Sequence, residues 1–242
     1  GQKSTPASVQ VKVDHTAPEL KLSGPLTEQG KIGTNASEYV LNFDASDGDV
    51  QAPATLTPIG SAGTTAGKLQ RPQGVALDGS GNLWVVDKNN YRIQKFDKDG
   101  KFLLQVGGTQ GTAPGQFFDT RAVAVTSNGT VWVSEINGRL QAFNTSGGFI
   151  RQIHQDVLDQ AYGIAPAPSG TLWVSDPGAS LVYRINETTG AKLSNVYGSS
   201  GNPTGAANVP YPAGLAADGT GGVWVADPVN DRVQRFNASG KF

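Results

Sequence analysis

The 242-residue chain contains no cysteine, no methionine and only two histidines. The absence of cysteine excludes disulfide bridges, iron–sulfur clusters and thiolate zinc sites. Two histidines cannot supply the three imidazole ligands of a three-histidine zinc site. We therefore expect no cofactor and no metal site.

The chain also lacks an excess of charge of either sign and lacks long apolar runs. Lysine and arginine total 19, aspartate and glutamate total 20, and the formal net charge is −1. A protein that binds the phosphate backbone needs a basic surface, so we expect no nucleic-acid partner. No run of about 18 apolar residues is present, so we expect no direct insertion into a membrane.

What the sequence does contain is a fourfold repeat centred on tryptophan. The segments GNLWVVD, GTVWVSE, GTLWVSD and GGVWVAD place their tryptophans 48, 41 and 51 residues apart. An acidic residue follows each tryptophan three positions later. The four pairs are Trp84 and Asp87, Trp132 and Glu135, Trp173 and Asp176, and Trp224 and Asp227.

Each copy holds four short apolar runs separated by glycine, asparagine and aspartate. In the first copy these runs are residues 74–77, 83–86, 92–96 and 102–106. Short alternating strands with such turns predict a four-stranded up-and-down sheet. A sheet repeated every 40–50 residues is typical of a propeller blade. We predict an all-β fold with blades at about 69–115, 116–156, 157–205 and 206–242.

The first and fourth copies resemble an NHL repeat. They read PQGVALDGSGNLWVVDKNNYRIQKFDKDGKF, from Pro72 to Phe102, and PAGLAADGTGGVWVADPVNDRVQRFNASGKF, from Pro212 to Phe242. The second copy has Arg121 and Ala122 where a Pro-x-Gly start is usual, and the third has Leu181 where the repeat's arginine is expected. The resemblance implies an NHL-type β-propeller, with the four blades forming part of a six-bladed ring.

The first 56 residues follow a different pattern. Val9, Val11 and Val13 alternate with polar residues, which predicts a strand. The Thr16-Ala17-Pro18 segment looks like the linker between tandem Ig-like modules. We interpret residues 1–56 as a partial Ig-like β segment and residues 57–68, rich in glycine, alanine and threonine, as a linker.

One further resemblance concerns location. The run VKVDHTAPELKLSG is similar to segments of large secreted bacterial proteins that carry Ig-like modules, NHL repeats and RHS/YD repeats. The similarity implies an extracellular or cell-surface location, in which the propeller is one part of a larger protein.

The tryptophans and the acids that follow them are interpreted as structural. Each tryptophan stands between apolar neighbours in the middle of a strand, which predicts burial between blades. The acids are expected to accept backbone N–H bonds and to pair with Arg92, Arg139 and Arg232. The third copy lacks this arginine, so Asp176 is the acid that we expect to be most available for another role.

The candidate binding surface is one rim of the propeller. The loops leading into each inner strand and the loops joining the second and third strands gather at this rim. Residues at these positions vary between the copies, and tyrosine and arginine are typical interface anchors. The predicted binding rim consists of Arg71, Tyr91, Arg121, Tyr162, Tyr211 and Asn230.

Four classes of function follow. The first, which we favour, is a non-enzymatic binding or scaffold module that presents the rim to a protein or glycan ligand, or to the rest of its own larger chain. The second is a metal-dependent, lactonase- or lyase-like propeller enzyme, with Asp119 and Asp231 near the channel mouth. The third is RNA binding, as in TRIM-type NHL proteins, which needs a basic face. The fourth is the sensor domain of a membrane-anchored kinase. The first is favoured because no catalytic constellation is visible.

Overall fold

The structure is a computed structural model that describes residues 58–154, 156–197 and 209–242, together with four short strands in the first 57 residues. The chain divides into two units, Gly1–Thr57 and Pro58–Phe242. In the first unit, β1 (Ser8–Gln10) pairs in parallel with β4 (Asn42–Asp44), and β2 (Lys12–Val13) pairs antiparallel with β3 (Pro18–Glu19). The remainder of the predicted Ig-like segment lies outside the described residues.

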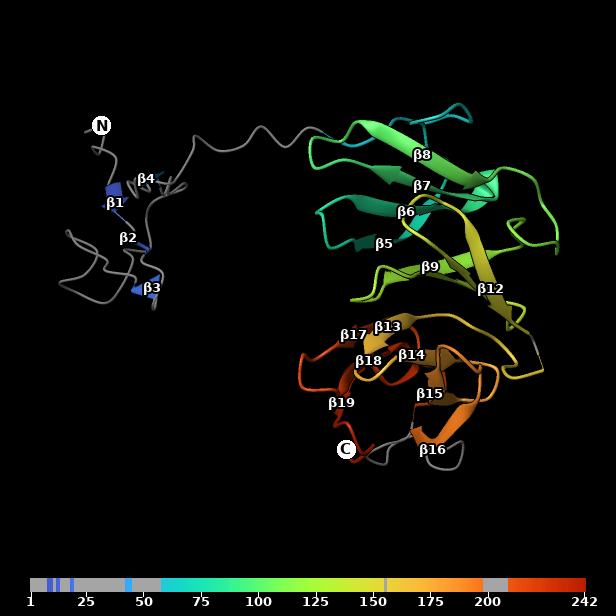
Figure 1. Cartoon of the computed structure of the whole chain (residues 1–242). Helices are drawn as coiled ribbons and strands as arrows, with labels where there is room; N and C mark the ends of the chain where they lie inside the picture. The colour runs from blue at the N-terminus through green and yellow to red at the C-terminus, as the bar shows by residue number, and fades with distance from the viewer. Residues whose placement is uncertain are drawn as a thin grey trace. The chain divides into compact units, whose positions relative to one another are not determined.

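The second unit consists of successive antiparallel sheets, the propeller blades of Figure 1. Blade 1 contains β5 (Pro72–Leu77), β6 (Leu83–Asp87), β7 (Arg92–Phe96) and β8 (Phe102–Gly107). Blade 2 contains β9 (Thr120–Val125), β10 (Val131–Glu135), β11 (Leu140–Phe143) and β12 (Phe149–Ile153). Blade 3 contains β13 (Ile164–Ala167), β14 (Thr171–Asp176), β15 (Leu181–Asn186) and β16 (Lys192–Tyr197). Blade 4 contains β17 (Leu215–Ala217), β18 (Val223–Asp227) and β19 (Arg232–Phe236).

Strands within each blade are neighbours in chain order, so every blade is an up-and-down meander. The predicted all-β propeller architecture is confirmed. Two short 3₁₀ turns, η1 (Lys88–Asn90) and η2 (Pro228–Asn230), follow the second strands of blades 1 and 4. In the described part of the chain, no helix is long and apolar enough to cross a membrane.

The turns between third and fourth strands show how the sequence sets this meander. In blade 2 the side-chain Oδ1 of Asn144 accepts hydrogen bonds from the backbone N–H groups of Ser146 and Gly148, at 3.0 and 2.8 Å. Gly147 supplies the left-handed conformation that the turn requires, with φ of 84°. Asp97, Asn186 and Asn237 cap the matching turns of the other blades in the same way.

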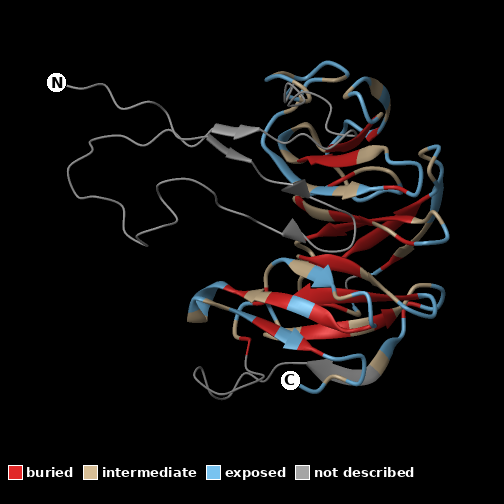
Figure 2. Ribbon diagram, turned by 90° about the vertical axis from the view of Figure 1, so that its left-hand side faces the viewer, coloured by how far each residue is buried: buried red, intermediate tan, exposed pale blue. Residues whose placement is uncertain are grey.

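Apolar side chains between neighbouring blades form the core. Trp84 of blade 1 is buried with Val123 of blade 2, and Trp132 of blade 2 is buried with Ile164 of blade 3. Trp173 of blade 3 packs in turn with residues of blade 4. Figure 2 shows the buried segments running through the middle blades. Each of these three tryptophans therefore faces the blade that follows it.

Trp224 departs from the predicted burial of all four tryptophans. It is exposed, because blade 4 is the last described blade and no further blade packs against its outer face in the part of the chain that the structure describes. The tryptophan of each blade thus contacts the next blade, and the tryptophan side chain is buried only where that next blade packs against it.

Residues 58–68 also differ from the prediction, which treats them as a linker. They belong to the propeller unit and form the crossover loop that leads into blade 1. An isolated bridge joins Ala62 to Leu69, matching the bridge between Gln110 and Phe117 in the crossover before blade 2. Polar side chains of blade 1 hold this segment through its backbone: Asn90 donates to the carbonyl oxygen of Gly63 and Arg92 to that of Thr65, each at 2.9 Å.

Candidate interaction rim

The acid after each tryptophan anchors the loop that leads into its blade. The carboxylate of Asp87 accepts a hydrogen bond from the backbone N–H of Gln70 at 2.6 Å and another from the side-chain Nε of Arg92 at 2.7 Å. Arg92 then donates to the carbonyl oxygens of Thr65 and Lys68, at 2.9 and 2.7 Å. The crossover loop is therefore tied to the sheet by a buried ion pair.

Blade 2 repeats this arrangement. Glu135 accepts from the backbone N–H of Phe118 at 2.7 Å and pairs with Arg139 at 2.8 Å. Arg139 donates to the carbonyl oxygens of Thr112 and Gln116, at 2.5 and 2.8 Å. The same chemistry thus positions the next loop of the rim.

Blade 3 holds its loop without a cation. The carboxylate of Asp176 accepts backbone hydrogen bonds from Asp159, Gln160 and Ala179 at 3.0, 3.0 and 3.1 Å. Burial raises the pKa of Asp176, and these hydrogen bonds oppose the rise. Both oxygens are engaged, so Asp176 is not the available acid that the sequence suggested.

Left-handed backbone conformations lie at equivalent places along this rim. Arg71 and Asp119, in the leading loops of blades 1 and 2, have φ of 58° and 43°. Tyr91, Ser180 and Asp231, after the second strands, have φ of 52°, 57° and 49°. A left-handed conformation costs about 1–2 kcal/mol for a residue other than glycine, and it persists only where neighbouring contacts hold the backbone in place. The backbone of the rim loops therefore has a defined conformation in the absence of a partner.

Five side chains from the four blades make a continuous line across the rim, which we call the rim ladder: Lys88, Asp119, Arg121, Tyr162 and Tyr211. Lys88 Nζ lies 2.5 Å from Asp119 Oδ1, and Asp119 Oδ2 lies 2.8 Å from Arg121 Nη2. The Arg121 guanidinium is 5.3 Å from the centre of the Tyr162 ring. The Tyr162 and Tyr211 rings are 6.4 Å apart and inclined by 69°.

The six residues of the predicted binding rim have different environments. Arg121, Tyr162 and Tyr211 are brought together in the ladder, and Arg71 is exposed. Tyr91 packs instead against the core between blades 1 and 2, and Asn230 donates to Asp227 at 2.9 Å. These two side chains contribute to the scaffold.

Sequence reasoning did not include Lys88 and Asp119 in the binding rim. The sequence places Asp119 in the loop leading into blade 2, near the channel mouth. The sequence does carry a signal in the opposite charges of these two residues. Lys88 follows the second strand of blade 1, Asp119 stands in the loop leading into blade 2, and both loops gather at the same rim. Their pairing requires knowledge of how far apart neighbouring blades stand.

The central channel offers little chemistry. Its wall is formed by the inner strands, with apolar residues such as Val75, Leu77 and Leu215. Among the described residues, no group of three or more histidine, aspartate or glutamate side chains is placed to hold a metal ion. His154, the one histidine of the propeller unit, is exposed.

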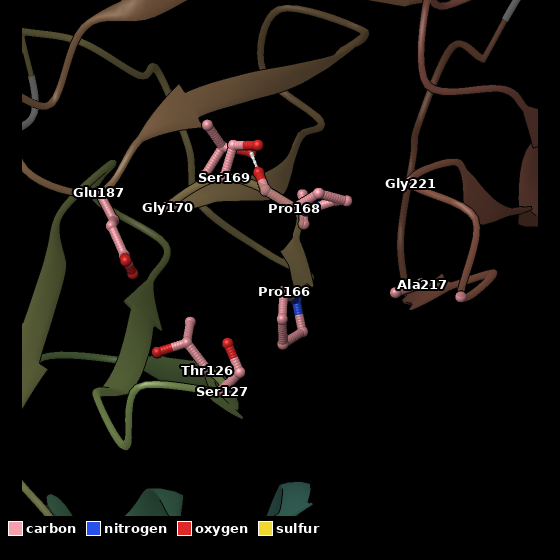
Figure 3. Close-up of a pocket in the computed structure, with 12 residues that line it drawn as sticks. Thr126, Ser127, Pro166, Pro168, Ser169, Gly170, Glu187, Ala217 and Gly221 are labelled. Atoms are coloured by element: carbon pink, nitrogen blue, oxygen red, sulfur yellow. Dashed lines mark hydrogen bonds between the residues drawn. The ribbon is translucent and has the colours of Figure 1, made fainter.

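A hollow of about 380 Å³ lies among turns of blades 2, 3 and 4, away from the rim ladder (Figure 3). Its wall carries small neutral residues such as Ser127, Pro168 and Gly170. The one charged side chain, Glu187, accepts hydrogen bonds from Asn128 Nδ2 at 2.9 Å and Trp132 Nε1 at 3.3 Å. The carboxylate thus links blades 2 and 3.

Comparison with known proteins identifies the repeat. Residues 69–96 match the NHL repeat family. The B-box type zinc finger protein ncl-1 of Caenorhabditis elegans is 35% identical over 153 residues, which are 62% of this chain and 18% of that protein. Protein brain tumor of Drosophila melanogaster is 27% identical over 118 residues, 48% of this chain and 11% of that protein. The chain spans less than a fifth of either relative.

Solved structures show the same fold at low sequence identity. A streptogramin B lyase structure has a TM-score of 0.54 and 18% identity, and the match covers 70% of this chain and 52% of the lyase chain. A chain of a nidogen/laminin complex has a TM-score of 0.55 and 19% identity, with coverages of 70% and 60%. These likenesses concern the propeller fold alone.

The comparisons correct the expected location. The expectation of an extracellular or cell-surface protein is contradicted, because ncl-1, brain tumor and the further relative lin-41 are intracellular proteins. These relatives are animal proteins, and neither a bacterial source nor RHS/YD or Ig-like neighbours receives support. The NHL repeat and the propeller fold are consistent with a protein-binding scaffold.

Proposed function

We propose that this propeller is a non-enzymatic protein-binding module and that its partner docks on the rim ladder. The observation that carries the proposal is the contact of Arg121, Tyr162 and Tyr211 across three blades. Arginine and tyrosine are over-represented among the residues that dominate binding energy at interfaces. Here they stand on strand ends and anchored loops, so that little conformational entropy is lost on binding.

The exposure of the ladder supports a docking role. Tyr211 at its end is 40% exposed, whereas Arg121 is mostly covered by its neighbours. A partner would therefore meet an aromatic surface whose cation is already oriented. The mixed charges of Lys88, Asp119 and Arg121 favour a polar protein surface over a uniformly anionic ligand.

Site-specific photo-crosslinking tests this proposal. A photoreactive phenylalanine analogue at position 211 should crosslink a defined protein in extracts, and the same analogue at position 127, on an exposed turn away from the ladder, should not. The substitution Arg121→Ala should weaken the crosslink at position 211, because it removes the cation that orients Tyr162. The double substitution Ser127→Ala and Ser169→Ala is the matched control and should leave it unchanged.

Two outcomes would overturn the proposal. One is equal crosslinking at positions 211 and 127, which would show that the rim is not selective. The other is crosslinking at position 211 that nuclease abolishes and salt weakens, which would make RNA the ligand. A glycan partner would appear instead as loss of the crosslinked species after glycosidase treatment.

A further inference from the structure

A second hollow lies between blades 1 and 2, at the end of the blades opposite the rim ladder. It has a volume of about 490 Å³ and is lined by the turns between the first and second strands, with small residues such as Gly79, Ser80 and Ser127. The charged residues of its wall are Asp78 and Lys95. The volume is within the range of sites that hold small ligands.

At the next junction, between blades 2 and 3, a carboxylate of the chain itself occupies the corresponding place. Glu187 of blade 3 accepts hydrogen bonds from Trp132 Nε1 at 3.3 Å and from Asn128 Nδ2 at 2.9 Å, both in blade 2. Trp132 is 1% exposed. The following blade thus supplies the acceptor that this buried indole N–H requires.

Thr145 of blade 2 holds the position that Glu187 holds in blade 3. Each of the two residues comes directly after the asparagine that caps the turn between the third and fourth strands. Each also stands beside the glycine that precedes the second strand of its own blade. A Cβ on Gly129 would lie 3.7 Å from Thr145 Cγ2, and a Cβ on Gly170 would lie 3.4 Å from Glu187 Oε1. At the junction of blades 1 and 2 the chain therefore has a threonine in place of the glutamate.

Two donors of blade 1 lack an acceptor at this junction. Trp84 is 0% exposed, and its Nε1 has no hydrogen-bond partner in the part of the chain that the structure describes. The Lys95 ammonium lies 5.3 Å from the centre of the Trp84 ring. It donates to the carbonyl oxygen of Thr145 at 3.1 Å and to the Asp78 carboxylate at 2.9 Å, which uses two of its three protons. A buried donor without an acceptor is costly, and an added acceptor here is favoured.

The charges around the hollow favour a single carboxylate as that acceptor. The side chains of Lys95 and Asp78 are 10% and 3% exposed, so their buried charges balance each other. The neighbouring Asp78 repels a multiply charged anion. A single carboxylate matches Glu187, which accepts from an indole and an amide and forms no ion pair among the described residues.

We propose that the hollow between blades 1 and 2 binds a carboxylate supplied from outside the chain, either a free small carboxylate or an acidic side chain of another protein. One oxygen would accept from Trp84 Nε1 and the other from Lys95 Nζ, as the two oxygens of Glu187 each accept one hydrogen bond. Entry requires a side-chain rotation in the wall of the hollow, because Trp84 Nε1 is shielded from solvent. The site does not involve the rim ladder and is independent of the proposed function.

NMR signals of the indole N–H groups test the site. The chain has four tryptophans, and Trp84→Phe identifies the signal of Trp84. Three probes are used: sodium acetate, sodium glutarate and N-acetylglutamate N-methylamide, which stands for an acidic side chain. Each should move the Trp84 signal downfield and leave the Trp132 signal in place, because Trp132 already donates to Glu187. Sodium chloride at the same ionic strength should move neither signal.

The relative affinities of the probes distinguish the two sources of the carboxylate. Tighter binding of the glutamate amide than of acetate and glutarate would identify an acidic side chain of a protein. Equal or tighter binding of acetate or glutarate would identify a free small carboxylate. Both results support the proposal.

Thr145→Glu supplies the carboxylate from within the chain. The variant should move the Trp84 signal downfield without any probe, and it should weaken probe binding about tenfold or more because a like charge fills the site. Ser146→Glu is the matched control. It adds the same charge at the next residue, which is exposed and outside the lining of the hollow, and it should change neither the signal nor the binding.

Two outcomes would overturn the proposal. One is a Trp84 signal that no probe moves beyond the sodium chloride control. The other is a Thr145→Glu variant whose Trp84 signal moves while the probes bind as tightly as before, because the probes would then bind elsewhere on the protein.

Discussion

Arg92 Nε lies 2.7 Å from Asp87 Oδ2, and the two side chains are 4% and 0% exposed. The pair links the end of the second strand to the start of the third strand. Arg92 also binds the crossover loop, by donating to the carbonyl oxygens of Thr65 and Lys68. The residues of the repeat signature thus determine where the rim loops stand.

Removing Arg92 should destabilise the propeller strongly. Arg92→Ala leaves the buried Asp87 carboxylate without its cation and releases the crossover loop, so we expect a loss of about 3–5 kcal/mol in the free energy of unfolding. Urea denaturation followed by tryptophan fluorescence measures this loss. The control is Arg232→Ala in blade 4, where the arginine is 29% exposed and the loss should be smaller. Equal losses would contradict the role assigned to burial.

Acid should weaken blade 1 through Asp78. Burial alone would raise the pKa of this carboxyl, but hydrogen bonds from Lys95, Asn82 and Ser80 outweigh burial and hold the pKa well below its ordinary value. A lowered folded-state pKa adds stability at pH values above about 4, the ordinary pKa, and this stability is lost as the pH falls toward the folded-state value.

Asp78→Asn isolates this contribution. The variant should be less stable than the native chain at pH 7. The difference should shrink progressively as the pH falls below about 4, because protons then bind the unfolded native chain more readily than the folded one, and it should vanish only below the lowered folded-state pKa. Unfolding free energies measured between neutral and acidic pH give the comparison. A difference that is constant with pH would show that the side chain acts through shape alone.

Two glycines in the left-handed conformation should respond differently to alanine. A Cβ at Gly138 would lie 2.1 Å from the carbonyl oxygen of Leu158, whereas a Cβ at Gly81 would meet nothing within 4 Å. Both residues have positive φ, so both substitutions should cost about 1–2 kcal/mol in backbone strain. Gly138→Ala should cost about 1–3 kcal/mol more because the loop must move. Thermal unfolding of the two variants distinguishes these costs.

The sequence was sufficient for features that repeat within one blade. The tryptophan frame and the Asn and Asp turns recur in all four copies, and the acid–arginine pair recurs in three of them at a spacing of four or five residues. Each of these features acts within its own sheet or its adjoining loop. The exposure of Trp224 could not be predicted from its blade, because it depends on the neighbour. The composition of residues 58–68 predicts a linker for a related reason, because the contacts of this segment come from Arg92 of the following blade.

The rim ladder depends on distances between blades, which the sequence does not contain. Tyr91 and Tyr162 looked alike as exposed aromatic anchors, yet Tyr91 packs into the core between blades 1 and 2. Tyr162 instead contacts Arg121 of the preceding blade and Tyr211 of the following one. Only the placement of neighbouring blades separates these two roles.

A double-mutant cycle on Arg121 and Tyr162 tests whether the ladder is organised before binding. The guanidinium lies 5.3 Å from the ring centre and is held on its other side by Asp119. We expect a coupling free energy of about 0.5–1 kcal/mol between Arg121→Ala and Tyr162→Ala in the unbound protein, the range of a partly exposed cation–aromatic contact. Tyr162→Phe keeps the ring and should preserve the stability that Tyr162→Ala loses through this contact. Zero coupling would mean that the two side chains move independently in solution, and the rim would then have to order itself when its partner binds.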